Sequence, residues 1–204
     1  MNYLAHIVLS KKDIDYQLGN LLADPLKGKP WAGCSPSHLD GIQMHGWIDS
    51  FTDANQHVRR AKTRLGTKGY LKGVVIDITF DHLLIKHWEQ FINTDINKFI
   101  NTFNLNSLNN LNNLPKQASD FIKRIIAHNV LSSYENFSGL ESALKRIDLR
   151  LSPRILAKET ASSYLPLIAS NLESIEEDFL LFFPELAHYF IDKSGSSAQE
   201  RWLK

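Results

Sequence analysis

Three side chains that can bind a metal recur at intervals of four residues between positions 45 and 53: His45, Asp49 and Asp53. Four residues of an α-helix rise about 6 Å and turn through roughly 400°, so these groups should form one row on a single helix face. The row is either a solvated polar face or a site. Its histidine and the flanking aromatic residues favour a site, because imidazole and carboxylate groups are costly to bury without a partner. We therefore expect them to hold a cation.

A second row, formed by Asp77 and Asp81 with His82 beside it, lies in an apolar segment. The β-branched residues in this segment would suit a strand. The apolar pattern continues at helical spacing, however, and the run is too long for a typical strand. We therefore predict a buried helix over residues 72–93. Aspartates inside such a helix are hard to explain as surface residues, which makes them candidate ligands.

Two further candidates lie closer to the N-terminus. His6 interrupts the apolar segment 1–10, which fits a strand or a buried first helical turn, and it is either a core histidine or a ligand. Asp24 precedes Pro25, so it either caps a helix that begins at Pro25 or points its carboxylate into a break in the chain.

Imidazole and carboxylate ligands without a thiolate suit Mn²⁺, Mg²⁺ or Fe²⁺ better than a structural zinc. Cys34 is the only cysteine, which excludes both a thiolate zinc cluster and an intramolecular disulfide. A cation in such a site lowers the pKa of bound water and holds a phosphoryl oxygen. Hydrolysis of a phosphate ester is therefore the chemistry that these residues favour.

The composition sets the broad class. A chain of 204 residues with 43% hydrophobic and 22% charged residues is typical of one globular domain. A net charge of +1 excludes a protein-wide basic field, so we expect no nucleic-acid partner. No apolar run approaches the roughly 20 residues of a membrane-spanning helix, and no signal peptide is recognisable. We expect a cytoplasmic protein that does not bind membranes.

A basic run without an acidic residue follows the candidate site; its members are Arg59, Arg60, Lys62, Arg64, Lys68 and Lys72. Such runs are usually solvated helix faces. This one could also receive an acidic protein or a phosphate group, whereas the lack of interleaved aromatic residues disfavours nucleic acid.

The second half of the chain is predicted to be scaffold. We expect helices near 116–132, 138–147, 153–170 and 171–192, the last beginning at a capping box formed by Ser170 and Glu173. Pro184 should kink or restart that helix, and the tail 194–198 should be mobile. Four polar residues could reach the site, but their spacing gives no reason to prefer the site over solvent: Tyr134, Arg146, Arg150 and Arg154.

Five short blocks resemble the bacterial acyl-carrier-protein phosphodiesterases, which are distant relatives of the all-helical HD phosphohydrolases. The blocks lie at 2–6, 19–24, 41–45, 48–53 and 80–82. The resemblance implies an all-α, single-domain helical bundle of HD-domain-like type over residues 1–204, with the site in 1–92 and scaffold helices in 115–193.

The resemblance also implies the reaction. Enzymes of this family hydrolyse holo-acyl carrier protein to apo-acyl carrier protein and 4′-phosphopantetheine, with Mn²⁺ as the favoured metal. Six residues match motif positions and are assigned to the metal and its water: His6, Asp24, His45, Asp49, Asp81 and His82. Asp77 and Asp53 are assigned either to the residues that surround the ligands or as substitute ligands. Among the catalytic residues Asp24, His6 and His82, we favour Asp24 as the general base.

The chain departs from the family pattern at Gly46 and Trp47, where relatives often carry an arginine, and at Pro25, where relatives carry a bulkier apolar residue. Such an arginine could hold the phosphate or the acidic carrier protein. We hypothesise that Arg59, Arg60 and Arg64 form a substitute docking surface. Two alternatives remain: a phosphohydrolase of the same fold that acts on a nucleotide or another small phosphate ester, and a non-catalytic helical binding protein. The number of metal ions and the oligomeric state are not predicted.

Overall fold

The computed structural model describes residues 1–194 and 202–204, which form helices and no strand; within these ranges the one β-type contact is an isolated bridge between Ile92 and Leu203. The all-α prediction is therefore confirmed. The tail predicted to be mobile lies, beyond Ser194, outside the described residues. The α-helices are α1 (Tyr3–Leu9), α2 (Ile14–Leu22), α3 (Pro36–Ala54), α4 (Gln56–Arg64), α5 (Lys72–Lys86), α6 (Trp88–Phe91), α7 (Ile96–Asn109), α8 (Lys116–Ala127), α9 (Phe137–Asp148), α10 (Pro153–Leu156) and α11 (Leu165–Ser194).

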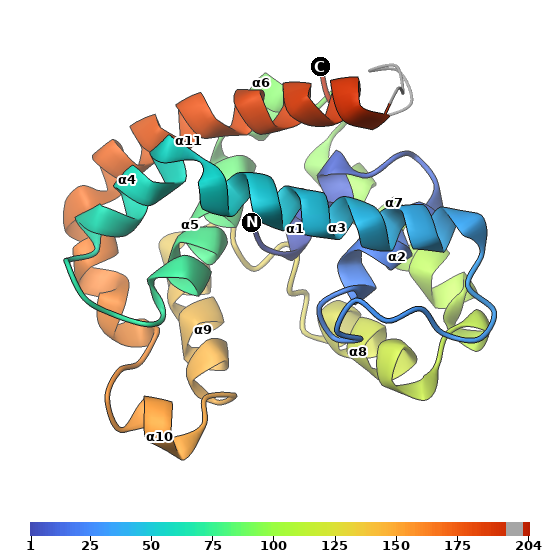
Figure 1. Cartoon of the computed structure of the whole chain (residues 1–204), viewed down its shortest axis with the longest axis horizontal. Helices are drawn as coiled ribbons and strands as arrows, with labels where there is room; N and C mark the ends of the chain where they lie inside the picture. The colour runs from blue at the N-terminus through green and yellow to red at the C-terminus, as the bar shows by residue number, and fades with distance from the viewer. Residues whose placement is uncertain (195–201) are drawn as a thin grey trace.

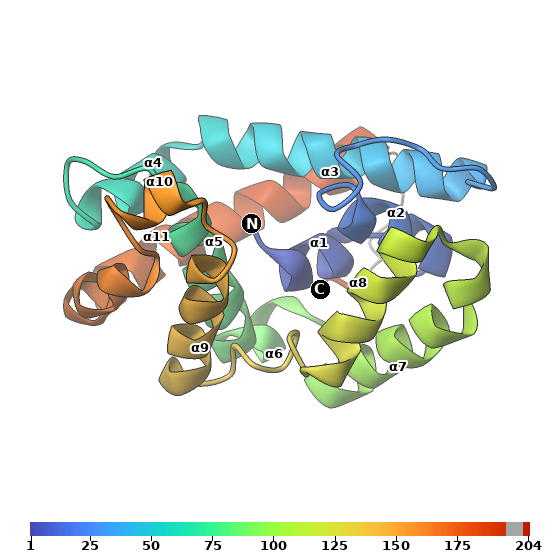
Figure 2. The same cartoon turned by 90° about the horizontal axis from the view of Figure 1, so that it is seen from below.

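The long helix α3 spans the molecule, with α4, α5 and α9 towards one end and α2, α7 and α8 towards the other (Figure 1). Seen from below, the first residues of the chain and α1 lie between α8 and α9 (Figure 2). None of the helices in the described part of the chain combines the length and hydrophobicity needed to cross a bilayer.

Backbone contact between α2 and α3 positions the first half of the site. A Cβ atom on Gly19 would lie 2.1 Å from the carbonyl oxygen of His38, and one on Gly41 would lie 2.2 Å from that of Tyr16. Only glycine allows helices to approach this closely. The turn that carries Asp24 directly follows α2, so this contact sets its distance from α3.

The beginning of α3 follows from its sequence. Pro36 occupies the first turn, where a missing N–H costs nothing, and Ser35 and His38 form a capping box. The predicted helix 72–93 is wrong at its end, because it divides at His87 into α5 and α6. Helix α5 nevertheless forms a central part of the core, where Phe80 packs against Phe179 and Phe182 of α11.

The predicted boundaries near the C-terminus are wrong. In place of one helix over 153–170, the chain forms the four-residue α10 and a 3₁₀ turn at Ser162–Tyr164. Helix α11 then begins at Leu165, with Pro166 in its first turn, so Ser170 is an interior residue whose hydroxyl donates to the carbonyl of Pro166. Helix α11 also continues through Pro184 without restarting.

Candidate active site

His6, His45 and Asp49 come together from α1 and α3. One ligand atom from each lies within 4.8 Å of the other two. His45 Nε2 is 3.1 Å from Asp49 Oδ2, and His6 Nε2 is 3.6 Å from Asp49 Oδ1. The two imidazole rings stack with their centroids 4.2 Å apart. We call these three residues the histidine cluster. The helical row predicted from the four-residue spacing therefore supplies two of its members.

Asn20 determines which nitrogen of His6 carries the proton. The Asn20 amide nitrogen donates to the carbonyl of His6 and to the hydroxyl of Ser10, which orients the amide oxygen towards His6 Nδ1 at 2.8 Å. That oxygen can only accept, so Nδ1 is the protonated nitrogen and Nε2 presents a lone pair. Burial lowers the pKa of His6, which keeps the ring neutral. An imidazole that is held from behind by a hydrogen bond is typical of metal sites.

Asp24 borders the cluster. Its Oδ1 lies 3.2 Å from His45 Nε2, and its side chain is 69% exposed at the surface. It does not cap a helix at Pro25, because residues 23–28 form a turn. The hydrogen bond with His45 holds the pKa of Asp24 below its ordinary value. Asp24 is therefore a carboxylate that is reachable from solvent and in direct contact with the cluster.

Protonation compensates the charge of the cluster in the absence of a cation. Burial alone would lower the pKa of His45, but hydrogen bonds with Asp24 and Asp49 raise it to about 9. Burial would raise the pKa of Asp49, but hydrogen bonds with His45 and His6 hold it well below its ordinary range. Because the lone pair of His6 Nε2 also faces Asp49, a cation bound at this point would replace the His45 proton.

Asp77, Asp81 and His82, the second predicted set, lie on α5 but have partners elsewhere. Asp81 is fully buried and accepts N–H groups of Leu4 and Ala5 at 2.9 and 3.4 Å. His82 donates from Nδ1 to the Tyr134 carbonyl oxygen at 2.6 Å. Asp77 accepts from the amino group of Met1 at 2.9 Å. The structure does not bring these three residues into the histidine cluster, and their assignment as ligands or catalytic groups stays a prediction.

Asp53 also stands outside the cluster. Although it continues the helical row, its side chain is exposed and pairs with Lys62 at 3.0 Å. Gly46 and Trp47 lie between His45 and Asp49 on α3, and a Cβ atom on Gly46 would meet no neighbour within 4 Å. No arginine lies on this stretch of α3.

Two of the three arginines in the predicted docking surface have a partner within the chain. Arg60 and Arg64 both bind the buried carboxylate of Asp178 on α11, Arg64 at 2.7 Å, so they join α4 to α11. A buried carboxylate requires such partners. Of the three arginines proposed to receive the carrier protein, only Arg59 is outside this network among the described interactions.

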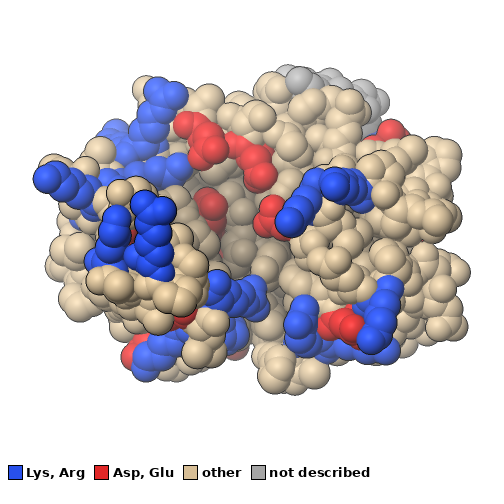
Figure 3. Space-filling model, turned by 60° about the horizontal axis from the view of Figure 1, so that its bottom comes forward, with Lys and Arg blue, Asp and Glu red and all other residues tan. Residues whose placement is uncertain are grey.

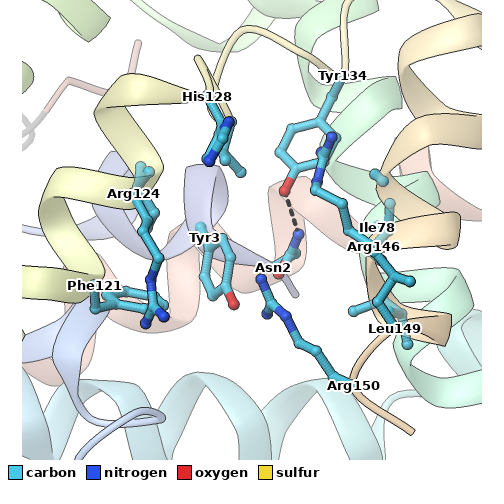
Figure 4. Close-up of a pocket in the computed structure, with 14 residues that line it drawn as sticks. Asn2, Tyr3, Ile78, Phe121, Arg124, His128, Tyr134, Arg146, Leu149 and Arg150 are labelled. Carbon is cyan, nitrogen blue, oxygen red and sulfur yellow. Dashed lines mark hydrogen bonds between the residues drawn. The ribbon is translucent and has the colours of Figure 1, made fainter. Parts of the chain in front are cut away.

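Sequence reasoning missed a set of arginines that surrounds a cavity between α1, α8 and α9. The cavity has a volume of about 210 Å³, and its lining includes Arg124, Arg146, Arg150 and Tyr3 (Figure 4). On the face turned towards the viewer in Figure 3, the surface is hollowed near its centre, with acidic atoms inside and basic ones around it. The sequence gives no reason to place Arg146 and Arg150 at the site rather than in solvent, and it does not single out Arg124. No local signal marks them, because they lie far from the cluster in the sequence.

The fold and the site define a class: a helical protein with a histidine–carboxylate centre beside an arginine-lined cavity. Residues 1–186 match the sequence profile of the family described as acyl carrier protein phosphodiesterase, so the chain belongs to this family. The family assignment drawn from the five sequence blocks is thereby confirmed.

Curated relatives match over nearly their whole length. The acyl carrier protein phosphodiesterase of Yersinia pestis is 28% identical over 188 residues, which is 91% of this chain and 95% of the relative. The enzyme of Serratia proteamaculans is 28% identical over 195 residues, which is 95% of this chain and 99% of the relative. That of Salmonella agona is 29% identical over 190 residues, covering 91% and 95%. No solved structure matches the chain significantly, so the HD-domain likeness stays a prediction.

Proposed function

We propose that this chain is a metal-dependent phosphodiesterase that hydrolyses holo-acyl carrier protein to apo-acyl carrier protein and 4′-phosphopantetheine. Membership of the family and the names of the curated relatives support the reaction. A single observation supports metal binding. His6, whose Nε2 carries a lone pair, has a ligand atom within 4.8 Å of ligand atoms of both Asp49 and His45. We also propose a cytoplasmic location, where the carrier protein would be available.

His6, His45 and Asp49 would hold the cation, with Mn²⁺ favoured and Mg²⁺ or Fe²⁺ as substitutes. When bound, such a cation polarises a phosphoryl oxygen and lowers the pKa of a water molecule. His45 must release its proton first, so the affinity for the cation should rise with pH towards the His45 pKa of about 9. Asn20 holds His6 in the tautomer that ligation requires.

Asp24 is suited to the proton transfer. Its carboxylate is exposed, remains ionised at neutral pH and touches the cluster through His45. In the proposed reaction a water oxygen forms a bond to phosphorus, and the bond from phosphorus to the serine oxygen of the carrier protein breaks. Asp24 accepts a proton from the water, and this proton passes to the serine oxygen as it leaves. His82 has no assigned step in this proposal.

The test is to incubate the purified protein with holo-acyl carrier protein, with and without Mn²⁺, and to measure the intact mass of the carrier. We expect the carrier to lose the phosphopantetheine mass only when metal is present. Asp49→Asn should abolish this loss, whereas Asp40→Asn, an exposed residue of the same helix, should not. Absence of cleavage by metal-loaded wild type would refute the proposal. Equal cleavage of small phosphate esters would instead support the phosphohydrolase alternative.

A further inference from the structure

The arginine-lined cavity combines charge with an apolar wall. Helix α9 contributes Ala143 and Ile147, helix α8 contributes Phe121 and Ile125, and α5 contributes Ile78. The ring of Phe121 packs edge-to-face against Tyr3 with centroids 5.6 Å apart. A volume of about 210 Å³ is below the usual range of pockets that enclose a whole drug-sized ligand, which begins at about 300 Å³. The cavity can therefore enclose part of a longer, flexible ligand.

The guanidinium groups of Arg124, Arg146 and Arg150 line the cavity without a carboxylate partner among the described residues. The ion pairs in the described part of the chain include none of the three. Arg146 donates to the hydroxyl of Ser133, which leaves its charge uncompensated. In Figure 4, Arg124 and Arg150 approach the tip of Tyr3 from opposite sides. Like charges around one cavity repel, and an anion placed between them is stabilised by charge-assisted hydrogen bonds.

The cavity adjoins a depression in the surface beside Asp24. A neighbouring depression is lined by Asp24 and Pro25, and it shares four lining residues with the cavity: Tyr3, Phe121, Arg124 and Arg150. Asp24 in turn contacts His45 of the histidine cluster. Arg124 and Arg150 thus stand between the apolar cavity and the centre where the phosphorus would react.

We propose that this cavity holds the 4′-phosphopantetheine arm, with Arg124 and Arg150 on the phosphate oxygens and the arm along the apolar wall. The assignment rests on the proposed function. The arm is a slender chain with a dimethyl branch and two amides, and the cavity offers both apolar contacts and polar groups such as Asn2 and His128. The arginines supply the phosphate recognition that α3 lacks at Gly46 and Trp47, and they come from α8 and from the residues that follow α9.

The first test measures binding of free 4′-phosphopantetheine to the full chain by calorimetry, which requires no turnover. Arg124→Gln and Arg150→Gln should each weaken binding by about tenfold or more, because each removes a charge-assisted contact. Arg154→Gln is the matched control on α10, outside the cavity lining, and should leave binding unchanged. Equal effects of all three changes, or none, would overturn the assignment.

Two further measurements separate the phosphate from the arm. Pantetheine, which lacks the phosphate, should bind more weakly than 4′-phosphopantetheine and should be insensitive to Arg124→Gln. Ala143→Met, which adds volume to the wall, should weaken both ligands alike. If inorganic phosphate bound as well as 4′-phosphopantetheine, the apolar wall would have no role and the assignment of the arm would be wrong.

The outcome also distinguishes this inference from the proposed function. If wild type cleaves holo-acyl carrier protein and the arginine variants retain the wild-type KM, the cavity assignment fails and the function stands. If wild type binds 4′-phosphopantetheine through the two arginines but does not cleave the carrier, the function fails and the binding site stands. If it neither binds nor cleaves, both are wrong.

Discussion

His45 and Asp49 on α3 share their four-residue spacing with Asp77 and Asp81 on α5, yet the two pairs have different surroundings. The pair on α3 meets a second imidazole, His6, and an exposed carboxylate, Asp24. Asp81 on α5 is fully buried and faces the main-chain N–H groups at the start of α1. A carboxylate whose oxygens already accept N–H groups is typical of a structural role, as in helix capping.

The difference teaches that spacing finds candidate residues but that partners decide their use. At the histidine cluster, two hydrogen-bond acceptors, His6 Nε2 and the Asp49 carboxylate, face one another. Only a proton or a cation makes this arrangement favourable. At Asp81, backbone N–H groups of Leu4 and Ala5 already donate to the carboxyl oxygens. We therefore expect changes at the first region to affect chemistry and changes at the second to affect stability.

The largest effect is expected at His45. His45→Gln should lower kcat/KM on holo-acyl carrier protein by more than about 100-fold, because even residues that only orient metal ligands contribute about 10- to 100-fold. Steady-state kinetics with saturating Mn²⁺ would measure the loss. His188→Gln, a change at an exposed histidine of α11, is the control. Near-normal activity of His45→Gln would remove the histidine cluster from the mechanism.

At Asp81 we expect the reverse pattern. Asp81→Ala should lower the free energy of unfolding by about 2–4 kcal/mol, because two buried N–H groups lose their acceptor. Urea denaturation would measure this loss, with Asp53→Ala as an exposed control that should change stability by less than about 0.5 kcal/mol. If Asp81→Ala kept its stability and instead lost bound metal, the division between the two regions would be wrong.

The contact between α2 and α3 gives a smaller effect that reaches the site through the backbone. Gly41→Ala should cost about 1–3 kcal/mol, because the new methyl group forces the helices apart. It should also lower activity by moving Asp24 away from His45. Gly46→Ala on the same helix meets open space and should raise stability by up to about 1 kcal/mol. Thermal melts of the Gly41→Ala and Gly46→Ala variants would test this difference, and equal shifts of the two melting temperatures would contradict the packing argument.

The smallest expected effect is on the pH dependence of stability, which should differ between the two regions. It would be measured as the free energy of unfolding at a series of pH values, with a chelator present to remove metal ions. Burial raises the pKa of Asp81 to about 7, so its native form holds a proton that the unfolded chain releases near pH 4. Stability from this group is present below pH 4 and is lost as the pH rises to 7. The raised pKa of His45 has the same sign, with the loss between about 6.5 and 9.

Substitution would separate the two windows of pH. Asp81→Asn should remove the slope of stability against pH only in the lower range of pH, and His45→Gln should remove it only in the upper range. Added Mn²⁺ should reverse the upper slope, since the cation competes with the proton on His45. A slope that survives both substitutions would show that other groups govern the pH dependence.

Local patterns predicted much of the fold because they depend on neighbours in the sequence. Ser35 and Pro36 marked the start of α3, and the apolar spacing identified α5 as a helix. The end of α5 at His87 and the start of α11 at Leu165 were missed, because tertiary packing overrides weak local preferences there. Pro166, in the first turn of α11, was a usable signal for the true start.

The site was predictable where it is local and unpredictable where it depends on chain topology. The α3 row followed from helical spacing, whereas His6 was placed with it through the family resemblance. The backbone partners of Asp81 cannot be read from side-chain types. Arg124 and Arg150 follow Asp24 by 100 and 126 residues. Only the tertiary arrangement of α8 and of the residues after α9 brings them to the same depression.

Helix α1 carries a consequence for how the two halves of the site communicate. Tyr3 lines the cavity and His6 belongs to the cluster, and the two are one turn apart on a seven-residue helix. If His6 holds the proposed cation, a ligand that shifts α1 through Tyr3 would also shift this imidazole. Binding at two coupled sites is reciprocal. If the cation raises the affinity of the cavity for its ligand by some factor, the ligand raises the affinity of the cluster for the cation by the same factor. Substrate and metal would then report on each other through one short, rigid helix.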